Sequence, residues 1–332
     1  MANSIARRKF ISALGGAVIA LPHVARAQQP ATPVVGFIYG GSADGASRYA
    51  IAFRKGLNGT GYVEGQNVTV AYHWLEGHYD RLPALVAELV RRRVAVIATP
   101  GSGPAALAAK AATGTIPIIF GVAEDPAQLG LVASLARPGG HATGINFFAR
   151  EVVAKRLRLL HDLVPKAVRI AVLVNPANAS SAAATFREAQ EAAPTIGLQF
   201  QILNATTIGE IDAAFATLSR DRPDALFVAG DGFFDSRRGQ FATLAARDRI
   251  PAAYAHRDYV AAGGLMSYGT DLADVFHQVG VYTGSILKGA KPADLPVLQS
   301  TKFEFIINLQ TARALDIEVP SGVLSIVDEV IE

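Results

Sequence analysis

The stretch VAVIATPGSGPAALAAK (94–110) places small hydroxylated residues and two glycines where an apolar strand turns into a helix. Thr99 and Ser102 offer hydroxyl groups, and glycines such as Gly103 let another molecule approach the backbone closely. Backbone N–H groups at a helix start have no partner within the helix, so they attract anions and polar acceptors. We expect this turn to hold an anionic or strongly accepting group. Alternatively, Thr99 or Ser102 only caps the helix that begins at Pro104.

Two aspartates that follow apolar strands could bind a positively charged group. Asp125 ends IPIIFGVAED and Asp231 ends ALFVAGD, so each carboxylate is expected near a cleft edge. Two acids beside a turn that binds a carboxylate suit a zwitterion such as an amino acid. If the ligand is instead an aromatic or aliphatic carboxylate, one or both acids must bond Arg, Tyr or backbone groups. Asp125, which precedes Pro126, could also simply start a turn.

These residues lie between segments that alternate between strand and helix patterns. In the first series, the strands are expected at 33–40, 67–74, 95–100 and 116–122, and the helices at 46–62, 79–94, 104–113 and 127–140. In the second series, the helices are expected at 150–165, 179–197, 208–219 and 236–249, and the strands at 169–176, 198–205, 223–232 and 250–256. This alternation predicts an α/β fold with parallel sheets covered on both faces. Because the order repeats, we expect two similar lobes, with the remaining segments supplying crossovers and edge elements.

The loops that follow the strands should form the binding site. Ligands of open parallel sheets bind at the carboxyl ends of the strands, where loops lead into helix N-termini. Here these loops are small, polar and rich in glycine: Gly40-Gly41-Ser42, Thr99–Gly103, Glu124-Asp125, Asn175–Ser181, Asp231-Gly232 and Tyr268-Gly269-Thr270. On two facing lobes they would line one cleft.

Composition excludes several classes of protein. The chain has 332 residues, enough for two domains. Half of the residues are hydrophobic and only 18% are charged, which is not the composition of a disordered chain. The net charge is +3 and the basic residues are scattered, so a nucleic-acid partner is not expected. The absence of cysteine excludes disulfides, thiol catalysis and cysteine-ligated metals.

The first 27 residues are typical of an export signal. Arg7-Arg8-Lys9 precedes a short apolar run, and Ala25-Arg26-Ala27 forms an A-x-A cleavage pattern. The arginine pair resembles a twin-arginine signal, which exports folded proteins, although an ordinary Sec signal remains an alternative. We expect cleavage near Gln28 and a soluble periplasmic product. No cysteine follows the run to anchor a lipid.

Enzymatic and metal-binding interpretations fit less well. GSGPAA (101–106) satisfies the dinucleotide pattern G-x-G-x-x-A between a strand and a helix, so an exported NAD(P)-dependent oxidoreductase is the alternative function. However, the pattern follows the third strand instead of the first, and Pro104 stiffens the turn. PGSGP does not match a serine-hydrolase elbow. His73 and His78 are the nearest histidine pair, and one lies on a strand and the other in a loop, so no metal site is expected.

Several long phrases resemble one family: TPGSGPAALAAKAATGTIPIIFGVAEDPAQLGLVASLARPGGHATGI, RIAVLVNP, AAGGLMSYGTD, ILKGAKPADLPV and FEFIINLQTARALDI. They are similar to the solute-binding proteins of ABC transporters that include tryptophan- and tyrosine-binding members. The resemblance implies a type I periplasmic binding protein fold: two Rossmann-like lobes joined by hinge strands, with a small solute between them. It implies an ABC permease as partner, no cofactor, and no covalent chemistry. The lobes are expected to comprise 32–146 plus 263–295, and 147–262 plus 296–332.

The resemblance also implies roles for individual residues. The hydroxyls of Thr99 and Ser102 and the N–H of Gly103 would donate to a ligand carboxylate, and Asp125 would accept from an amine or hydroxyl. The other expected ligand-binding residues are Ser42 in the first lobe, Asn175, Asn178, Ser180 and Asp231 in the second, and Tyr254 and Tyr268, which would stack on or cap the solute.

Overall fold

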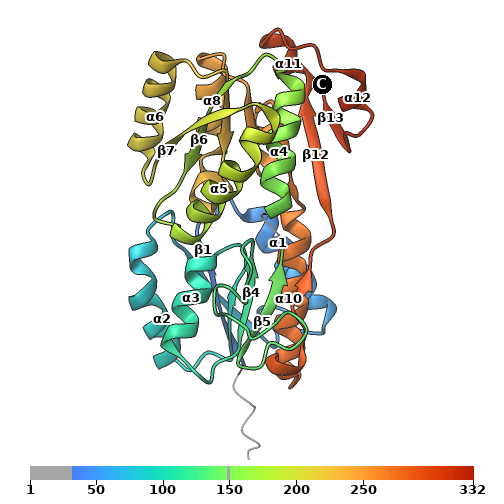
Figure 1. Ribbon diagram of the computed structural model, residues 1–332. Helices are drawn as coiled ribbons and strands as arrows, with labels where there is room; N and C mark the ends of the chain where they lie inside the picture. Colours follow the sequence, from blue (N-terminus) through green and yellow to red (C-terminus); the bar gives the residue numbers. More distant parts are fainter. Residues whose placement is uncertain (1–31, 148–149) are drawn as a thin grey trace, which may run out of the picture. The chain divides into compact units, whose positions relative to one another are not determined.

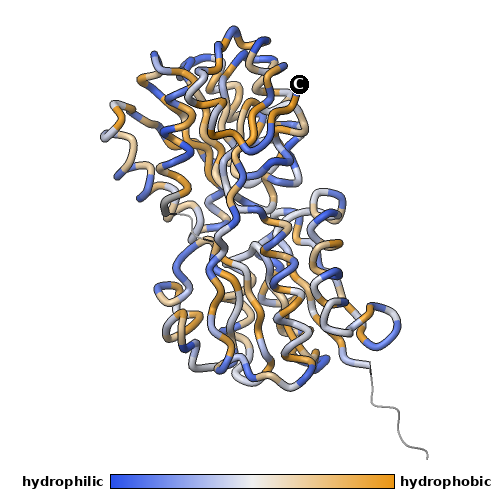
Figure 2. The backbone as a smooth tube through the Cα atoms, turned by 90° about the vertical axis from the view of Figure 1, so that its right-hand side faces the viewer, coloured by the Kyte–Doolittle hydropathy of each residue, from blue (hydrophilic) through white to orange (hydrophobic). Residues whose placement is uncertain are grey.

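A computed structural model describes residues 32–147 and 150–332 of the chain. The export signal predicted for residues 1–27 lies outside the described residues and stays a prediction. Residues 32–332 contain two separate sheets (Figure 1). The tube of Figure 2 is mostly hydrophobic along the strands inside each sheet, as expected for strands covered on both faces.

The first sheet has six parallel strands in the order β11-β5-β4-β3-β1-β2. Its strands are β1 (Val34–Tyr39), β2 (Thr69–Trp74), β3 (Val96–Thr99), β4 (Ile118–Val122), β5 (Ala142–Asn146) and β11 (Leu298–Gln299). Its helices are α1 (Ser47–Gly59), α2 (Leu82–Arg91), α3 (Gly103–Ala112) and α10 (Leu272–Leu287), with short 3-10 turns η1 (Tyr79–Arg81) and η3 (Pro292–Asp294). Successive residues of β1 point to opposite faces: Phe37 packs against Phe53 of α1 and Phe276 of α10, whereas Ile38 packs with Leu89 of α2.

The second sheet has seven strands in the order β13-β12-β10-β9-β8-β6-β7. They are β6 (Arg169–Val174), β7 (Gln199–Asn204), β8 (Ala225–Val228), β9 (Ala252–Tyr254), β10 (Met266–Thr270), β12 (Phe303–Asn308) and β13 (Glu329–Ile331). Only the pair β10–β12 is antiparallel among the described strands. The helices are α4 (Arg150–Leu163), α5 (Ala179–Ala192), α6 (Ile208–Asp221), α7 (Gly232–Ser236), α8 (Arg238–Arg247), α9 (Arg257–Ala261), α11 (Leu309–Ala314) and α12 (Ser321–Leu324), with η2 (Ala193–Ile196). α4 and α5 share one hydrophobic core with the sheet, and α6 to α9 share another.

Among the described elements, the chain passes from one lobe to the other three times: between β5 and α4, between β10 and α10, and between β11 and β12. These crossings differ from the lobe limits expected from the sequence. β10 lies within the range 263–295 assigned to the first lobe, but it pairs with β9 and β12 in the second sheet. β11 was assigned to the second lobe, but it pairs with β5 in the first sheet. Both strands are short and border a crossing, so their residue pattern does not reveal which sheet they join.

The helix expected at 127–140 is wrong, since this segment folds into turns. Asp125 Oδ1 accepts from the backbone N–H groups of Ala127 (2.8 Å) and Gln128 (3.3 Å), which fixes a tight turn. Gly130 then adopts a left-handed backbone conformation with φ of 71°, which ends any helical run. The helix expected from residue 236 begins earlier, at Gly232, and breaks at Arg237 into α7 and α8. No helix in the described ranges combines the length and apolar composition needed to cross a membrane.

Two glycines let α1 and α10 pack backbone to backbone (Figure 1). A Cβ atom at Gly280 would lie 2.1 Å from the carbonyl oxygen of Phe53, and one at Gly56 would lie 2.0 Å from that of His277. Gly280→Ala must therefore push the helices apart, and we expect it to lower the free energy of unfolding by about 2–3 kcal/mol. Urea denaturation measures this loss.

Gly59→Ala is the matched control for this prediction. Gly59 also lies on α1, but a Cβ there would have no atom within 4 Å. Since alanine favours helix more than glycine does, this variant should be neutral or slightly more stable. Equal urea midpoints for the two variants would contradict the close-packing explanation.

Candidate functional site

One cavity lies between the lobes, at the carboxyl ends of strands from both sheets. It encloses about 780 Å³ of empty space, its open mouth included. Its first-lobe lining is Tyr39, Gly101, Gly103, Ala123, Glu124, Phe147 and Leu272. Its second-lobe lining includes Val152, Val153, Arg156, Asn178, Ser181, Thr185, Asp231, Asp235 and His256. This is the place where open α/β sheets bind small molecules.

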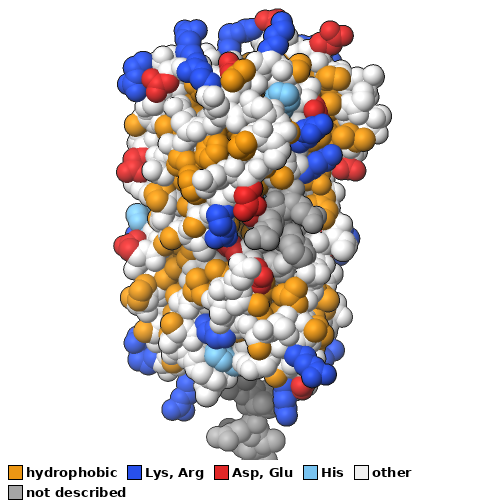
Figure 3. Space-filling view, in the orientation of Figure 1, with side chains coloured by type: hydrophobic (Ala, Val, Ile, Leu, Met, Phe, Trp, Pro, Cys, Tyr) orange, Lys and Arg blue, Asp and Glu red, His pale blue; other side chains and the backbone are white. Residues whose placement is uncertain are grey.

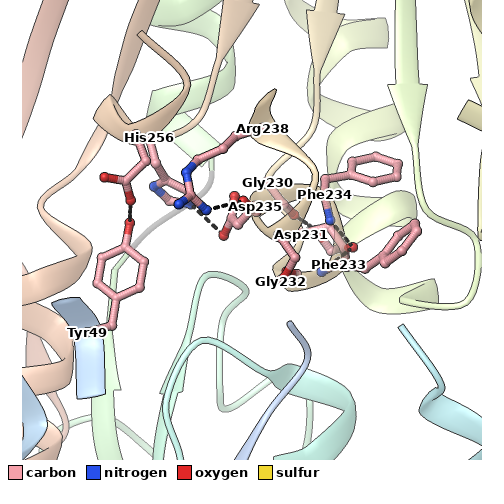
Figure 4. Close-up of polar contacts among 12 residues, drawn as sticks. Tyr49, Gly230, Asp231, Gly232, Phe233, Phe234, Asp235, Arg238 and His256 are labelled. Atoms are coloured by element: carbon pink, nitrogen blue, oxygen red, sulfur yellow. Dashed lines mark hydrogen bonds and ion pairs between the residues drawn. The ribbon is translucent and has the colours of Figure 1, made fainter. Parts of the chain in front are cut away.

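Asp231 lies at the centre of a buried hydrogen-bond network beside the cavity (Figure 4). As the N-cap of α7, its Oδ1 accepts from the backbone N–H groups of 233 and 234, at 3.0 and 3.3 Å. The side-chain amides of Asn175 and Asn178 donate to its two oxygens at 2.9 and 3.0 Å. The hydroxyl of Tyr79, from the first lobe, donates to Oδ2 at 2.9 Å. These five donors occupy the acceptor positions of the Asp231 carboxylate. Asp231 therefore joins the segments that carry Tyr79, Asn175 and Asn178 to the start of α7.

Asp235 lies one helical turn further along α7 and is far less satisfied. Its Oδ2 accepts from the Tyr39 hydroxyl at 3.1 Å and lies 3.7 Å from His256 Nε2. Its Oδ1 is buried and has no hydrogen-bond partner among the described residues. Burial, followed by the charges of Asp231 and Asp258, raises the pKa of Asp235 to about 8. Burial and the nearby Arg156 lower the pKa of His256 to about 4, so this imidazole is neutral at pH 7.

Arg156 brings a buried positive charge to the cavity wall. It lies on α4 and is only 5% exposed. Its Nε donates to the carbonyl oxygen of Tyr268 at 2.7 Å, and its guanidinium carbon lies 5.0 Å from the centre of the Phe227 ring. Burial lowers the pKa of Arg156 to about 10, which leaves the group charged at pH 7. A buried guanidinium with fork geometry is suited to bind a carboxylate.

Glu124 supplies an acid from the opposite lobe. Its carboxylate lies close to Gly103: a Cβ atom at that glycine would be 3.3 Å from Glu124 Oε2 and 3.3 Å from Ser180 Oγ. Glycine therefore keeps room where the start of α3 approaches α5 across the cleft. Ser181 and Thr185 on α5 and Thr270 add hydroxyl groups to the wall. The cavity thus contains a cation, acids on both lobes and several hydroxyl groups, of which those of Ser181 and Thr270 donate to the carbonyl oxygens of Gly230 and Phe147.

Tyrosines of the first lobe donate to aspartates of the second along one side of the cavity. Besides the bonds of Tyr39 and Tyr79 described above, the hydroxyl of Tyr49 donates to Asp258 Oδ2 (Figure 4). Arg48 forms an ion pair with the other oxygen of Asp258 at 2.7 Å. The backbone N–H of Ser42 donates to Ser236 Oγ at 2.7 Å. These bonds hold the two lobes together beside the cavity.

Among the residues predicted from the sequence, Gly103, Asn178 and Asp231 line this cavity. Asn175 joins the network of Asp231 behind the wall. The other predictions on the first lobe do not place side chains in the cavity lining. Thr99 is fully buried, Ser102 caps α3 by accepting from the Ala105 N–H, and Asp125 fixes its exposed turn. The alternative interpretations of Ser102 and Asp125 as cap and turn residues therefore describe their contacts in the structure.

The remaining predicted residues lie at the margins of the cleft or away from it. Ser42 contacts Ser236 at the side of the cleft, and Ser180 lies on α5 beside a second hollow at the mouth. Tyr254 is fully buried and stacks on Tyr259, with ring centres 4.6 Å apart. Tyr268 of β10 stacks on Phe303 of β12, with ring centres 6.3 Å apart. Neither tyrosine ring lines the cavity among the described residues.

Sequence reasoning missed Arg156, Asp235 and His256. The sequence pattern could have indicated Arg156, because this residue shares the apolar face of its helix with Val153, Leu157 and Leu160. An arginine within a buried stripe needs a specific partner. No sequence pattern indicated Asp235 or His256. The segment after Asp231 has the pattern of a loop, and His256 is the last residue of a strand pattern.

Figure 3 shows how the basic side chains are distributed on one face of the molecule. In Figure 3, most of the Lys and Arg side chains on this face lie toward the two ends of the molecule, interspersed with other residues. On this face they form no continuous stripe of the kind that tracks a phosphate backbone.

Comparison with known proteins supplies the family. Residues 35–331 match the model of a family described as ABC transporter substrate binding protein. The tyrosine-binding protein of Clostridioides difficile is 28% identical over 266 residues, which is 80% of this chain and 76% of that protein. A structure from Streptococcus pneumonia in complex with L-Trp has a TM-score of 0.80 at 24% identity, covering 90% of this chain and all of that one. The ligand-free, open structure of a substrate binding protein from Clostridium difficile has a TM-score of 0.60 at 25% identity, covering 87% of this chain and 96% of that chain.

Proposed function

This chain belongs to the family of ABC transporter substrate-binding proteins, and we propose that it captures an aromatic amino acid between its lobes for import across a membrane. The observation that carries the proposal is the charge pattern of the cavity. A buried guanidinium at Arg156 and carboxyl groups at Asp235 and Glu124 line the same space. A solute that carries both a carboxylate and an ammonium group would satisfy both kinds of charge.

The type I periplasmic binding protein fold and the family description both belong to binding proteins and not to enzymes. The dinucleotide interpretation of GSGPAA is accordingly abandoned. In the structure this segment follows the third strand, and Ser102 and Pro104 form the cap and first turn of α3. The expected partner is an ABC permease, and the expected compartment is the periplasm, which the predicted leader at 1–27 supports.

The proposed solute has an aromatic side chain because the cavity also has an apolar wall. Phe147, Val152, Val153 and Leu272 line it together with the ring of Tyr39. Apolar pockets with a few converging polar groups are typical of small-molecule sites. Two similar proteins are described as tyrosine-binding and as an L-Trp complex, which supports the same class of solute.

The mechanism that we propose is closure on the solute. A solute that contacts Arg156 and Asp235 on one lobe and Glu124 on the other favours the closed arrangement, since only that arrangement offers both sets of contacts. The bonds between the lobes, such as Tyr79 to Asp231, support a closed arrangement here. The higher TM-score to the L-Trp complex than to the open structure is in accord with this.

A thermal-shift panel tests the proposed solute class. The panel contains L-tyrosine, L-tryptophan, L-leucine, benzoate, 3,4-dihydroxybenzoate and myo-inositol. At a hundredfold excess over Kd a ligand stabilises the folded protein by about 2.7 kcal/mol, which gives a readable shift in Tm. We expect the aromatic amino acids to give the largest shifts. Shifts with the benzoates or the polyol and none with an amino acid would contradict the proposal.

Removing an ion pair between the lobes should weaken solute binding without changing any residue that lines the cavity. Arg48→Gln removes the ion pair with Asp258, which joins the lobes outside the cavity lining. Partly exposed pairs contribute up to about 1 kcal/mol, so the Kd for L-tyrosine should rise about two- to fivefold. Isothermal titration calorimetry measures it.

Arg249→Gln is the control for this variant. It removes a pair of similar length, 2.6 Å to Asp316, in which both partners belong to the second lobe. Its Kd should stay within the error of the wild type. If both variants weaken binding equally, the effect comes from net charge and not from closure.

A further inference from the structure

Two carboxyl groups of α7 border the cavity, and only one of them has room for a cation. Asp231 is saturated by donors from the protein, as described above. Asp235 Oδ2 accepts from the hydroxyl of Tyr39, and the hydroxyl of Tyr259 also interacts with the Asp235 carboxyl group. Its Oδ1 is buried and has no hydrogen-bond partner among the described residues, and the residue Asp235 lines the cavity. A buried oxygen of this kind costs free energy until a donor reaches it.

The groups around Asp235 favour its protonated, uncharged form near pH 7. Those that face it are Tyr39 of β1, Tyr49 of α1, Tyr79 of η1, Arg156 of α4, Asp231 at the start of α7, Arg238 of α8, and His256, Asp258 and Tyr259 at or in α9. Arg238 donates to the main-chain oxygen of Asp235 and not to its carboxyl group. Burial and two neighbouring acids outweigh the cations, and the pKa of Asp235 is raised to about 8.

Building on the proposed function, we propose that the solute's ammonium group binds at Asp235 Oδ1, and that Asp235 releases its proton to solvent as it does so. The O–H bond of the carboxyl group breaks, the proton passes to buffer, and an N–H of the ammonium group donates to the resulting carboxylate. The charge that Asp235 acquires is balanced by the solute's own cation. In the free protein no unpaired carboxylate has to be kept buried at this point.

His256 and Arg156, which also line the cavity, do not supply this proton. The pKa of His256 is lowered to about 4, so its imidazole is already neutral near pH 7. The pKa of Arg156, at about 10, keeps the guanidinium charged. Between pH 6 and pH 7, proton release on binding therefore reports on Asp235. The proton linkage also makes the site selective for solutes that carry an ammonium group. A solute without a cation does not stabilise the carboxylate form of Asp235, so Asp235 stays protonated.

Calorimetry of the whole mature protein tests this inference, with L-tyrosine and L-tryptophan as probes. Titrations at pH 7.0 in buffers of different ionisation enthalpy count the protons exchanged. With a pKa of about 8 in the free protein, we expect the release of about 0.9 proton per solute, falling to about 0.25 at pH 8.5. The Kd should fall about tenfold from pH 6 to pH 7. Binding with a proton count near zero, or with proton uptake, would overturn the inference and leave the proposed function standing.

Two variants test whether the proton released on solute binding comes from Asp235. Asp235→Asn keeps an oxygen for the Tyr39 hydroxyl but cannot ionise, so the release should vanish and the Kd should no longer change between pH 6 and pH 7. Asp212→Asn, an exposed acid of α6 on the same lobe, should release as many protons as the wild type. Undiminished release from Asp235→Asn would show that another group titrates and would refute the assignment. If neither amino acid binds the wild type, the proposed function itself fails.

Discussion

Arg156→Met is expected to raise the Kd for L-tyrosine by at least a hundredfold. The guanidinium is 5% exposed and lines the cavity, so a bound carboxylate next to it is shielded from water. Removing one partner of a buried ion pair costs about 3–5 kcal/mol, because the other charge is left unpaired. Methionine keeps much of the apolar stem beside Phe227, so the fold should survive. Isothermal titration calorimetry measures the loss.

Arg158→Met controls for the loss of a positive charge from the same helix. Arg158 is exposed and pairs with Asp162 one turn along α4. This variant should bind L-tyrosine like the wild type. Arg156→Lys should fall between the two, since lysine keeps the charge but loses the bidentate fork. A Kd within fivefold of the wild type for a folded Arg156→Met would remove Arg156 from the binding site.

Asp231→Ala is expected to lower the stability of the protein by about 4 kcal/mol or more. Five donors converge on this carboxylate in a site that is about 95% buried. Each buried donor left without an acceptor costs about 1–3 kcal/mol, so even partial rearrangement leaves a large deficit. Urea denaturation of the ligand-free variant measures the change.

The comparison with Thr207→Ala separates the network from ordinary helix capping. Thr207 caps α6 in the same lobe by accepting one bond, from the Glu210 N–H. Its loss should cost only about 1 kcal/mol. If Asp231→Ala costs no more than Thr207→Ala but abolishes binding, then Asp231 contacts the solute, as the sequence first suggested, and the structural role assigned here is wrong.

The strand and helix pattern predicts the two α/β lobes because buried strands and amphipathic helices leave regular signals. The prediction weakens where side chains compete with the backbone. The segment 127–140 has an apolar content that suits a helix, but the carboxylate of Asp125 and the left-handed Gly130 commit it to turns. The strands β10 and β11 each join the sheet of the lobe other than the one expected, because local periodicity does not reveal which sheet a strand joins.

The structure contains a cavity in the cleft at the strand ends, where the sequence predicts the binding site, and only some of the predicted residues line it. Residue type and spacing place Asn178 and Asp231 at the cavity, because both follow strands of the second sheet. They do not reveal that Asp231 is saturated by its neighbours or that Ser102 faces its own helix. Asp235 and His256 come together only through the fold, since α7 carries one and the start of α9 the other.

The central claim is that the cavity holds both charges of a zwitterion, and one calorimetric comparison tests it most directly. The wild-type protein is titrated with L-tyrosine, with tyramine, which lacks the carboxylate, and with 3-(4-hydroxyphenyl)propionate, which lacks the amine. If Arg156 pairs with the carboxylate and Asp235 with the ammonium, each truncated compound should bind at least a hundredfold more weakly than L-tyrosine. Equal or tighter binding of 3-(4-hydroxyphenyl)propionate would show that the site takes a simple carboxylate and would contradict the account.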